Sequence, residues 1–410
     1  MRLALGLVLV AACGDSGPTD RAADSGMDVT VDAAVGAADA GVDGAPPDAA
    51  LPDAALPDGA LPDAALPDAP ADTGVDAASE DAGEDAAPED AGPLTASRCI
   101  SDMFVTPSDF GPDYDAFSPT IGSHCNGTNH QDIRDVERVV FLGDSVTVGT
   151  PPTPTERYYR VQLAERLADR FRLERNEGLL HGFEWERWTN VDLFEGVSTL
   201  RTAGDFSSCA KWGARVDDLI RDNTQIEDCF PMSERGQRTL VVMTVGGNDI
   251  ANLTEGMLEG ETVDALWEQA REIVSLLEGA VDWIVEPGRF PGGVDVVFAN
   301  IYEFTDGTGD VSSCEGAALA GFDGELSDPD ALAEIVVWIN EQYMRVAVET
   351  GTDLVFLLES FCGHGFNADD PTTPCYRGPG AETWFDVSCT HPNPTGHDEI
   401  ADLFMSIVNE

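Results

Sequence analysis

Four short apolar runs lie between residues 139 and 358. They cover 139–142, 239–245, 294–302 and 352–358, and β-branched residues occur in each of them. Unbroken apolar runs of this kind are typical of strands that are buried on both faces of a sheet. The pattern therefore predicts a sheet that lies inside the fold.

Longer amphipathic segments separate and follow these runs. Apolar residues recur three or four positions apart over 159–172, 263–285 and 330–351, and a last such segment covers 394–408. This spacing is that of helices with one buried face. Strands that alternate with helices predict an α/β fold: a three-layer α/β/α sandwich around a central parallel, flavodoxin-like sheet of about five strands.

The N-terminal end has the outline of an export signal. Arg2 precedes an apolar tract over 3–10, and small residues then lead to Cys13. The tetrapeptide Val10-Ala11-Ala12-Cys13 resembles a bacterial lipobox. The resemblance implies that residues 1–12 are a lipoprotein signal peptide and that Cys13 becomes the lipidated first residue. The alternative is a chance apolar start behind a misplaced initiator.

Residues 13–97 are rich in Ala, Asp and Pro. A five-residue unit, Leu-Pro-Asp-x-Ala, repeats between residues 46 and 70. Such a segment buries too little apolar surface to offset the entropy cost of ordering the chain. We expect a disordered, extended stalk that leads to one folded domain over 98–410.

The chain carries a formal net charge of −54. This charge argues against nucleic acid as a partner, because phosphate binding needs clustered Lys and Arg. Anionic bilayers would repel the chain as well. We therefore expect membrane attachment through the lipidated Cys13, with the protein exported and anchored to the cell envelope, at the outer membrane or the cell surface.

Cysteine usage also favours an exported domain. The chain has nine cysteines, namely Cys13 and eight that follow in the domain without a close Cys-x-x-Cys pair. An even number predicts up to four disulfides formed in an oxidising compartment. Sequence neighbours such as Cys209 and Cys229 are the default pairs. The spacings do not suit zinc, and no metal is expected.

The triplet Gly-Asp-Ser occurs twice and can mark a nucleophilic serine. The first copy, at 14–16, lies in the stalk, where no fixed base or oxyanion donor can stand. The second copy ends at Ser145, directly after the strand-like run 139–142, and the motif Gly-Gly-Asn-Asp over 246–249 follows the next run. Parallel strands bring their carboxyl ends to one edge of the sheet, so these two motifs are expected to meet.

A nucleophilic serine needs a base within hydrogen-bond reach and donors aimed at the developing oxyanion. His391 stands just before the last helix and can supply the base. Gly213 directly precedes the start of an amphipathic segment, where a backbone N–H can face a cavity, and Asn248 can donate from its side-chain amide. Together with Ser145 these residues supply the parts of an ester-hydrolysing centre.

The four sequence motifs that contain Ser145, Gly213, Asn248 and His391, in this order, resemble those of the SGNH hydrolases, also called the GDSL lipase/esterase family. The resemblance covers residues 136–410. The resemblance implies Ser145 as nucleophile and His391 as base. It also implies oxyanion donors at the Ser145 N–H, the Gly213 N–H and the Asn248 amide, and a reaction without metal or cofactor.

One position departs from the family pattern. The family usually has an Asp three residues before the histidine, where this chain has Ser388. The nearest upstream carboxylate is Asp386, and either this residue or a backbone carbonyl is expected to orient His391. The second histidine, His397, is expected to pack or to lie at the surface. Asp144 is expected to make a structural hydrogen bond in the turn.

The predicted function is that of an exported, monomeric serine esterase or lipase. It would hydrolyse small-molecule, lipid or glycan esters through an acyl-enzyme. One alternative is a polysaccharide O-acetyl esterase, and another is a surface binding module that has lost turnover. Substrate choice is assigned to loops over 173–201, which include the aromatic stretch 183–188, and over 303–330. The Asp- and Gly-rich stretch 305–310 is expected to form turns rather than a calcium loop.

Overall fold

The computed structural model describes residues 94–410, apart from 106–110, 175–190, 199–203, 222–223 and 323. The predicted signal peptide, Cys13, nearly all of the predicted stalk and the aromatic stretch 183–188 lie outside the described residues.

A five-stranded parallel sheet forms the centre of the domain. Its strands stand in the order β4-β1-β5-β6-β7, which is the flavodoxin-type order. Their bounds are β1 Arg138–Gly143, β4 Phe206–Ser208, β5 Thr239–Thr244, β6 Val294–Ala299 and β7 Asp353–Val355. The predicted α/β fold with a parallel, flavodoxin-like sheet is confirmed.

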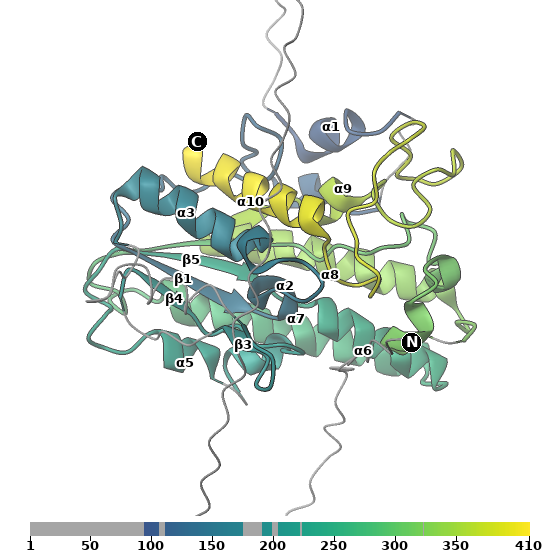
Figure 1. The fold of residues 1–410 in the computed structure, drawn as a ribbon, viewed down its shortest axis with the longest axis horizontal. Coiled ribbons are helices and arrows are strands. Elements are labelled where there is room, and N and C mark those ends of the chain that lie inside the picture. Colours follow the sequence, from purple (N-terminus) through teal and green to yellow (C-terminus); the bar gives the residue numbers. More distant parts are fainter. Residues whose placement is uncertain (1–93, 106–110, 175–190, 199–203, 222–223, 323) are drawn as a thin grey trace, which may run out of the picture. The chain divides into compact units, whose positions relative to one another are not determined.

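Helices cover both faces of the sheet (Figure 1). Val139 and Phe141 of β1 pack in a cluster with α3 (Tyr159–Phe171) and α10 (Pro394–Asn409). Val140 and Leu142, which point the other way, pack with α7 (Val263–Val285) and α8 (Pro329–Thr350). Successive strand residues face opposite sides of the sheet. Because helices bury both sides, nearly every residue of such a strand is apolar, and this explains the unbroken runs in the sequence.

Shorter elements complete the described part of the chain. The helices are α1 Ala96–Ser101, α2 Ser145–Val148, α5 Gln225–Cys229, α6 Gly247–Leu258 and α9 Leu357–Phe361, and a hairpin joins β2 Val191–Asp192 to β3 Val197–Ser198. Single 3₁₀ turns lie at Tyr114–Phe117, Thr155–Arg157, Val216–Leu219, Val311–Ser313 and Ala317–Ala320. No helix in the described part is long and apolar enough to cross a bilayer.

The composition of the apolar run 352–358 predicts one strand, and this prediction is wrong. β7 ends at Val355 and α9 begins at Leu357. Asn300, at the end of the neighbouring strand, accepts a hydrogen bond from the Leu358 N–H (2.7 Å). This side chain takes the backbone donor that a continuing strand would have needed, and the chain turns into a helix instead.

The eight cysteines of the domain form four disulfides. Cys209 pairs with Cys229, as predicted, and Cys99 pairs with Cys125. Pairing by sequence neighbours is wrong for the last four, because Cys362–Cys375 lies nested inside Cys314–Cys389. The fold packs the segment after β6 against the loop before α10, so that two cysteines 75 residues apart meet.

Candidate active site

The turn after β1 holds Ser145 at the carboxyl edge of the sheet. Gly143 has a φ of 130°, and a Cβ added there would lie 1.9 Å from the carbonyl oxygen of Thr244. Only glycine fits this position. Asp144 then caps α2, since its carboxylate accepts the Val146 N–H at 2.9 Å. This is the structural hydrogen bond expected of Asp144, and it leaves Ser145 as the first residue of the helix.

Gln225 supports the same turn from the edge of the sheet. Its amide donates to the carbonyl of Gly143 and accepts from the N–H of Gly143, both at 2.9 Å. The pairing of β1 with β4 ends at Phe141 and Ser208, so Gln225 takes the place of a strand partner. This role could not be predicted from the sequence, because an isolated glutamine in a polar stretch has no recognisable pattern.

Ser145 and His391 lie in direct contact. His391 Nε2 is 2.8 Å from Ser145 Oγ, although the residues are 246 positions apart. The loop that carries His391 is fixed on two sides. The Tyr302 hydroxyl donates to the Thr390 carbonyl at 2.8 Å, and Cys389 is bonded to Cys314. The structure thus brings the nucleophile and the base that the family resemblance implies within hydrogen-bond distance.

The other imidazole nitrogen faces hydroxyl groups. His391 Nδ1 lies 2.8 Å from Ser388 Oγ and 3.4 Å from Thr390 Oγ1. Ser388 in turn donates to Asp386 Oδ1 through its hydroxyl (2.5 Å) and through its backbone N–H (2.8 Å). Asp386 therefore faces the imidazole through Ser388 rather than directly, and no carbonyl takes that place in the described part of the chain.

The physical reason is a local turn. The Asp386 side chain folds back onto the N–H two residues ahead, as Asp often does in turns. In the sequence, Ser388 was notable only because it replaces the Asp that the family usually has at this position. A hydroxyl with both a donor and an acceptor role was the signal that could have identified it.

The candidate oxyanion donors stand around the same turn. Gly213 has a φ of 72°, and the loop that carries it is bound to its surroundings on both sides. The Trp212 indole donates to the Gly149 carbonyl at 3.0 Å, and the Asn248 amide donates to the Ala214 carbonyl at 2.9 Å. An amide has two N–H bonds, and among the described residues only one of those of Asn248 has a protein acceptor.

Two backbone N–H groups are further candidate oxyanion donors beside the Asn248 amide. Within the described ranges, the N–H groups of Ser145 and Gly213 have no protein acceptor. Asp249 braces the arrangement, because its carboxylate accepts the Val216 N–H at 3.1 Å. The Gly213 loop follows β4 and the Asn248 loop follows β5, and these two strands flank β1, after which Ser145 stands.

Burial sets the protonation of the groups near Ser145. It lowers the pKa of His391 below its usual 6.5, while the negative charge of Asp386 acts in the opposite direction and offsets part of the effect. A neutral imidazole at neutral pH can accept a proton. Burial also raises the pKa of both Asp144 and Asp249 to about 7.

His397 is a packing residue. It is fully buried in α10, its Nδ1 accepts the Tyr159 N–H at 3.2 Å, and its ring lies against those of Tyr158 and Tyr159. Burial, together with the nearby His391, lowers the pKa of His397 to about 3. The surface position allowed by the sequence is excluded, and the packing role is the one the structure has.

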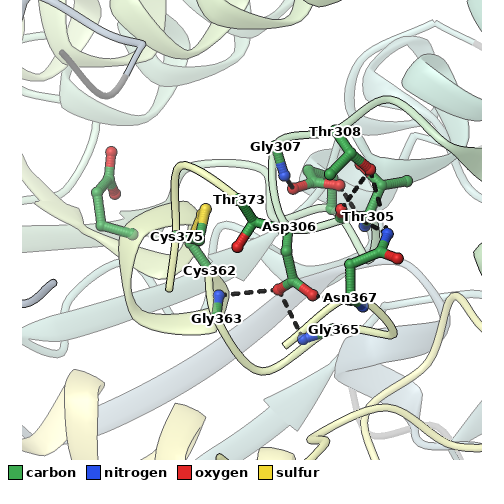
Figure 2. The surroundings of a disulfide bond; sticks show 12 residues. Thr305, Asp306, Gly307, Thr308, Cys362, Gly363, Gly365, Asn367, Thr373 and Cys375 are labelled. Carbon is green, nitrogen blue, oxygen red and sulfur yellow. Dashed lines mark hydrogen bonds between the residues drawn. A yellow bond between two sulfur atoms is a disulfide. The ribbon is translucent and has the colours of Figure 1, made fainter. Parts of the chain in front are cut away.

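The Asp- and Gly-rich turn around Asp306 joins the segment after β6 to the disulfide loop 362–375 (Figure 2). Asp306 Oδ1 accepts the N–H groups of Gly363 and Gly365, and Oδ2 accepts that of Asn367, each at 2.8 Å. Backbone donors therefore occupy the carboxylate oxygens that a cation would need. The turn fixes the loops that precede His391.

Comparison with known proteins gives one family match. The GDSL-like lipase/acylhydrolase family model matches residues 141–399. A solved gut microbial diltiazem-metabolizing enzyme is 14% identical, with a TM-score of 0.40, 68% of this chain covered and 48% of that one. A two-domain esterase active on acetylated mannans is 13% identical, with a TM-score of 0.32, 67% of this chain covered and 48% of that one. The chain thus spans about half the length of both, and no curated protein matches it.

Proposed function

The chain belongs to the GDSL-like lipase/acylhydrolase family, and we propose that it is an exported serine esterase that hydrolyses carboxylic esters with Ser145 as nucleophile. The observation that carries the proposal is the 2.8 Å contact between Ser145 Oγ and His391 Nε2. This is the distance at which an imidazole accepts a hydroxyl proton.

In the first step, His391 Nε2 takes the Ser145 proton while Oγ forms a bond to the ester carbonyl carbon. The tetrahedral intermediate then collapses, the bond to the alcohol breaks, and the imidazolium returns its proton to the leaving alkoxide. An acyl-enzyme on Ser145 remains. Water, deprotonated by the same nitrogen, attacks this acyl group. The second tetrahedral intermediate collapses with cleavage of its bond to Ser145 Oγ, the imidazolium returns the proton to Oγ, and the acid leaves.

The oxyanion of each intermediate would be held by three donors. These are the N–H groups of Ser145 and Gly213 and the free N–H of the Asn248 amide. Donors that are fixed before the reaction stabilise the transition state without reorganisation, and loss of one costs about 100- to 1,000-fold in rate. The hydrogen bond from Asn248 to Ala214 supports this role, since it holds the amide and the Gly213 loop together.

A pocket next to the His391 loop supports an ester with an apolar part. Its volume is about 510 Å³, and Pro152, Phe366, Phe385, Val387 and Pro394 share its wall with Thr153, Thr383, Asp386 and Asn393. Ser145 and His391 do not line it, so it would hold a part of the substrate away from the reacting carbonyl. Apolar walls of this kind bind acyl or aryl groups better than strongly polar ones. Lipid and small-molecule esters therefore come first among the substrates proposed.

Export and anchoring belong to the same proposal. Four disulfides in one domain are typical of an oxidising compartment. The lipobox-like segment that ends at Cys13 would attach the protein to the cell envelope by a lipid, with the low-complexity segment as spacer. Mass spectrometry of the membrane fraction tests this: a lipid-modified N-terminal peptide that begins at Cys13 is expected.

Hydrolysis of p-nitrophenyl acetate and butyrate by the chain and by Ser145→Ala tests the enzymatic proposal. We expect turnover by the former only. Equal inactivity of both on a panel of esters would favour the surface binding module. Acetate release from acetylated glycans, compared with fatty-acid release from lipids, separates an O-acetyl esterase from a lipase.

A further inference from the structure

We propose that the Ser388 hydroxyl, held by Asp386, is the group that positions the imidazole of His391, so that the chain uses an Asp–Ser–His relay instead of a direct carboxylate–imidazole contact. The inference rests on the proposed function in one respect, the role of His391 as base. It assigns a positioning role to two residues that lie away from the reacting atoms.

The direction of each hydrogen bond in the relay follows from what the groups can donate. A carboxylate only accepts, and a serine hydroxyl has a single proton. Asp386 Oδ1 lies 2.5 Å from Ser388 Oγ and accepts a hydrogen bond from the Ser388 hydroxyl. Towards His391 Nδ1, at 2.8 Å, the Ser388 oxygen can then only accept.

This order fixes the tautomer of the imidazole. If Ser388 accepts at Nδ1, that nitrogen carries the hydrogen and Nε2 presents its lone pair to Ser145 Oγ, 2.8 Å away. The tautomer with an Nδ1–H is the one that a general base at Nε2 requires. The carboxylate at the far end of the relay thus selects the reactive form of the base.

The relay is held in place by the backbone. The Ser388 N–H donates to Asp386 Oδ1 (2.8 Å), and the Asp386 N–H donates to the His391 carbonyl (2.9 Å). Asp386 is only 8% exposed. Thr390 Oγ1, the other hydroxyl near Nδ1, is 3.4 Å away and forms the weaker contact. Because the three side chains belong to one tight loop, their alignment with one another is set within that loop, whereas Tyr302 and the Cys314–Cys389 bond hold the loop as a whole.

The chain contains a second copy of the same turn without a histidine. The tripeptide Asp-Val-Ser occurs at 310–312 as well as at 386–388. Asp310 Oδ1 accepts the N–H of Ser312 at 3.0 Å and its hydroxyl at 2.6 Å. The turn is therefore a local structure that the sequence can form for itself. Only the copy at 386–388 places its hydroxyl against an imidazole, and Ser312→Ala provides a matched control.

A relay differs from a direct carboxylate in its effect on the charge of the base. Asp386 and, from α10, His397 are the titratable groups that act on the His391 ring, and Tyr302 contacts its loop as a neutral donor. A carboxylate at position 388 would stand against Nδ1 and favour imidazolium more strongly than Asp386 does through a hydroxyl. Ser388→Asp should therefore move the acidic limb of the rate profile to higher pH.

The experiment compares Ser388→Ala, Ser388→Thr, Ser388→Asp and Ser312→Ala in the full chain, by kcat/KM as a function of pH and by ¹⁵N NMR of the His391 ring. We expect Ser388→Ala to lose about 10- to 100-fold in kcat, the worth of one hydrogen bond to a developing charge, and Ser388→Thr to restore most of it. Ser312→Ala should match the parent chain. The NMR spectrum should show an Nδ1–H tautomer that weakens in Ser388→Ala.

The two proposals can fail separately. If the chain hydrolyses esters and Ser388→Ala keeps both the rate and the tautomer, the relay is overturned and the esterase stands. If no ester is hydrolysed but the Nδ1–H tautomer depends on Ser388, the relay stands and the proposed function falls. A folded Ser388→Thr variant with the kcat of Ser388→Ala would also overturn the relay, because a hydroxyl would then be present without effect.

Discussion

Cys314 is bonded to Cys389, two residues before the His391 that contacts Ser145. The bond connects the segment after β6 to the loop that carries the base. Cys389 has a φ of 70°, a left-handed conformation that residues other than glycine rarely adopt. The loop that presents the imidazole is therefore held from outside its own sequence.

Replacing Cys314 and Cys389 together by Ser should lower both stability and rate. Loss of a disulfide costs about 2–4 kcal/mol of unfolding free energy, and a loosened loop should reduce kcat at temperatures where the protein stays folded. The matched control is Cys99→Ser with Cys125→Ser, a pair in the segment before β1. It should lose stability but retain kcat. Equal loss of kcat in both double variants would show that the Cys314–Cys389 bond has no special role.

Gln225→Leu should damage the turn that presents Ser145. The substitution leaves the N–H of Gly143 without its acceptor, at a cost of about 1–3 kcal/mol for the unpaired buried group, and removes one of two donors to the Gly143 carbonyl, which keeps the Lys211 N–H. Urea unfolding should show the loss, and the rate at which a fluorophosphonate labels Ser145 should fall. Gln237→Leu, at a partly exposed glutamine outside this turn, serves as control, and labelling as fast as in the parent would contradict the role assigned to Gln225.

The rate should hold at neutral pH and fall on acidification with a midpoint below pH 6.5. Burial lowers the pKa of His391 below that value, so the imidazole stays neutral, and able to accept a proton, to a lower pH than a free histidine. A profile of kcat/KM from pH 4 to 8 measures this. A midpoint above 6.5 would show that the base is stabilised in its charged form.

Stability should decrease between about pH 4 and pH 7 through Asp144. Its folded pKa, raised by burial to about 7 from the usual 3.8, means that the folded state keeps a proton that the unfolded state releases. The stabilisation is complete below the unfolded value and is lost as pH rises through the folded one, by up to about 1.4 kcal/mol per pH unit. Asp144→Asn retains an acceptor for Val146 and should reduce the slope of unfolding free energy against pH, measured by denaturant unfolding at several pH values, while Asp249, whose pKa is also raised to about 7, keeps its own contribution. An identical slope in the variant would contradict the assignment.

The architecture could be predicted from periodicity alone. The helix over 263–285 and the strand around 139–142 were read from apolar spacing, because burial on one face or on both dictates which positions are apolar. The strand β4, Phe206–Ser208, could not be predicted, because it has only three residues and two of them are serines. Both serines are nevertheless buried, and the Arg138 guanidinium donates to Ser207 Oγ at 2.9 Å, so a polar contact stands where an apolar one would have marked a strand.

The site divides in the same way. Ser145 and Asn248 stand in motifs that each follow an apolar run, so their meeting could be predicted from parallel strands, whereas His391 was assigned from its place before the last helix and from the family resemblance. Gln225 and Ser388 act through polar contacts, those of Gln225 to a residue 82 positions away and those of Ser388 within a turn. No spacing rule reports such contacts, because they depend on where the completed fold leaves a donor without an acceptor.

The most direct test is to react the chain with a fluorophosphonate and to locate the adduct by peptide mass spectrometry. We predict one phosphonyl group per chain, on the peptide that carries Ser145, with no adduct in Ser145→Ala and a much slower reaction in His391→Ala. An adduct on another serine, or equal labelling of the parent and Ser145→Ala, would contradict the assignment of Ser145 as the nucleophile activated by His391.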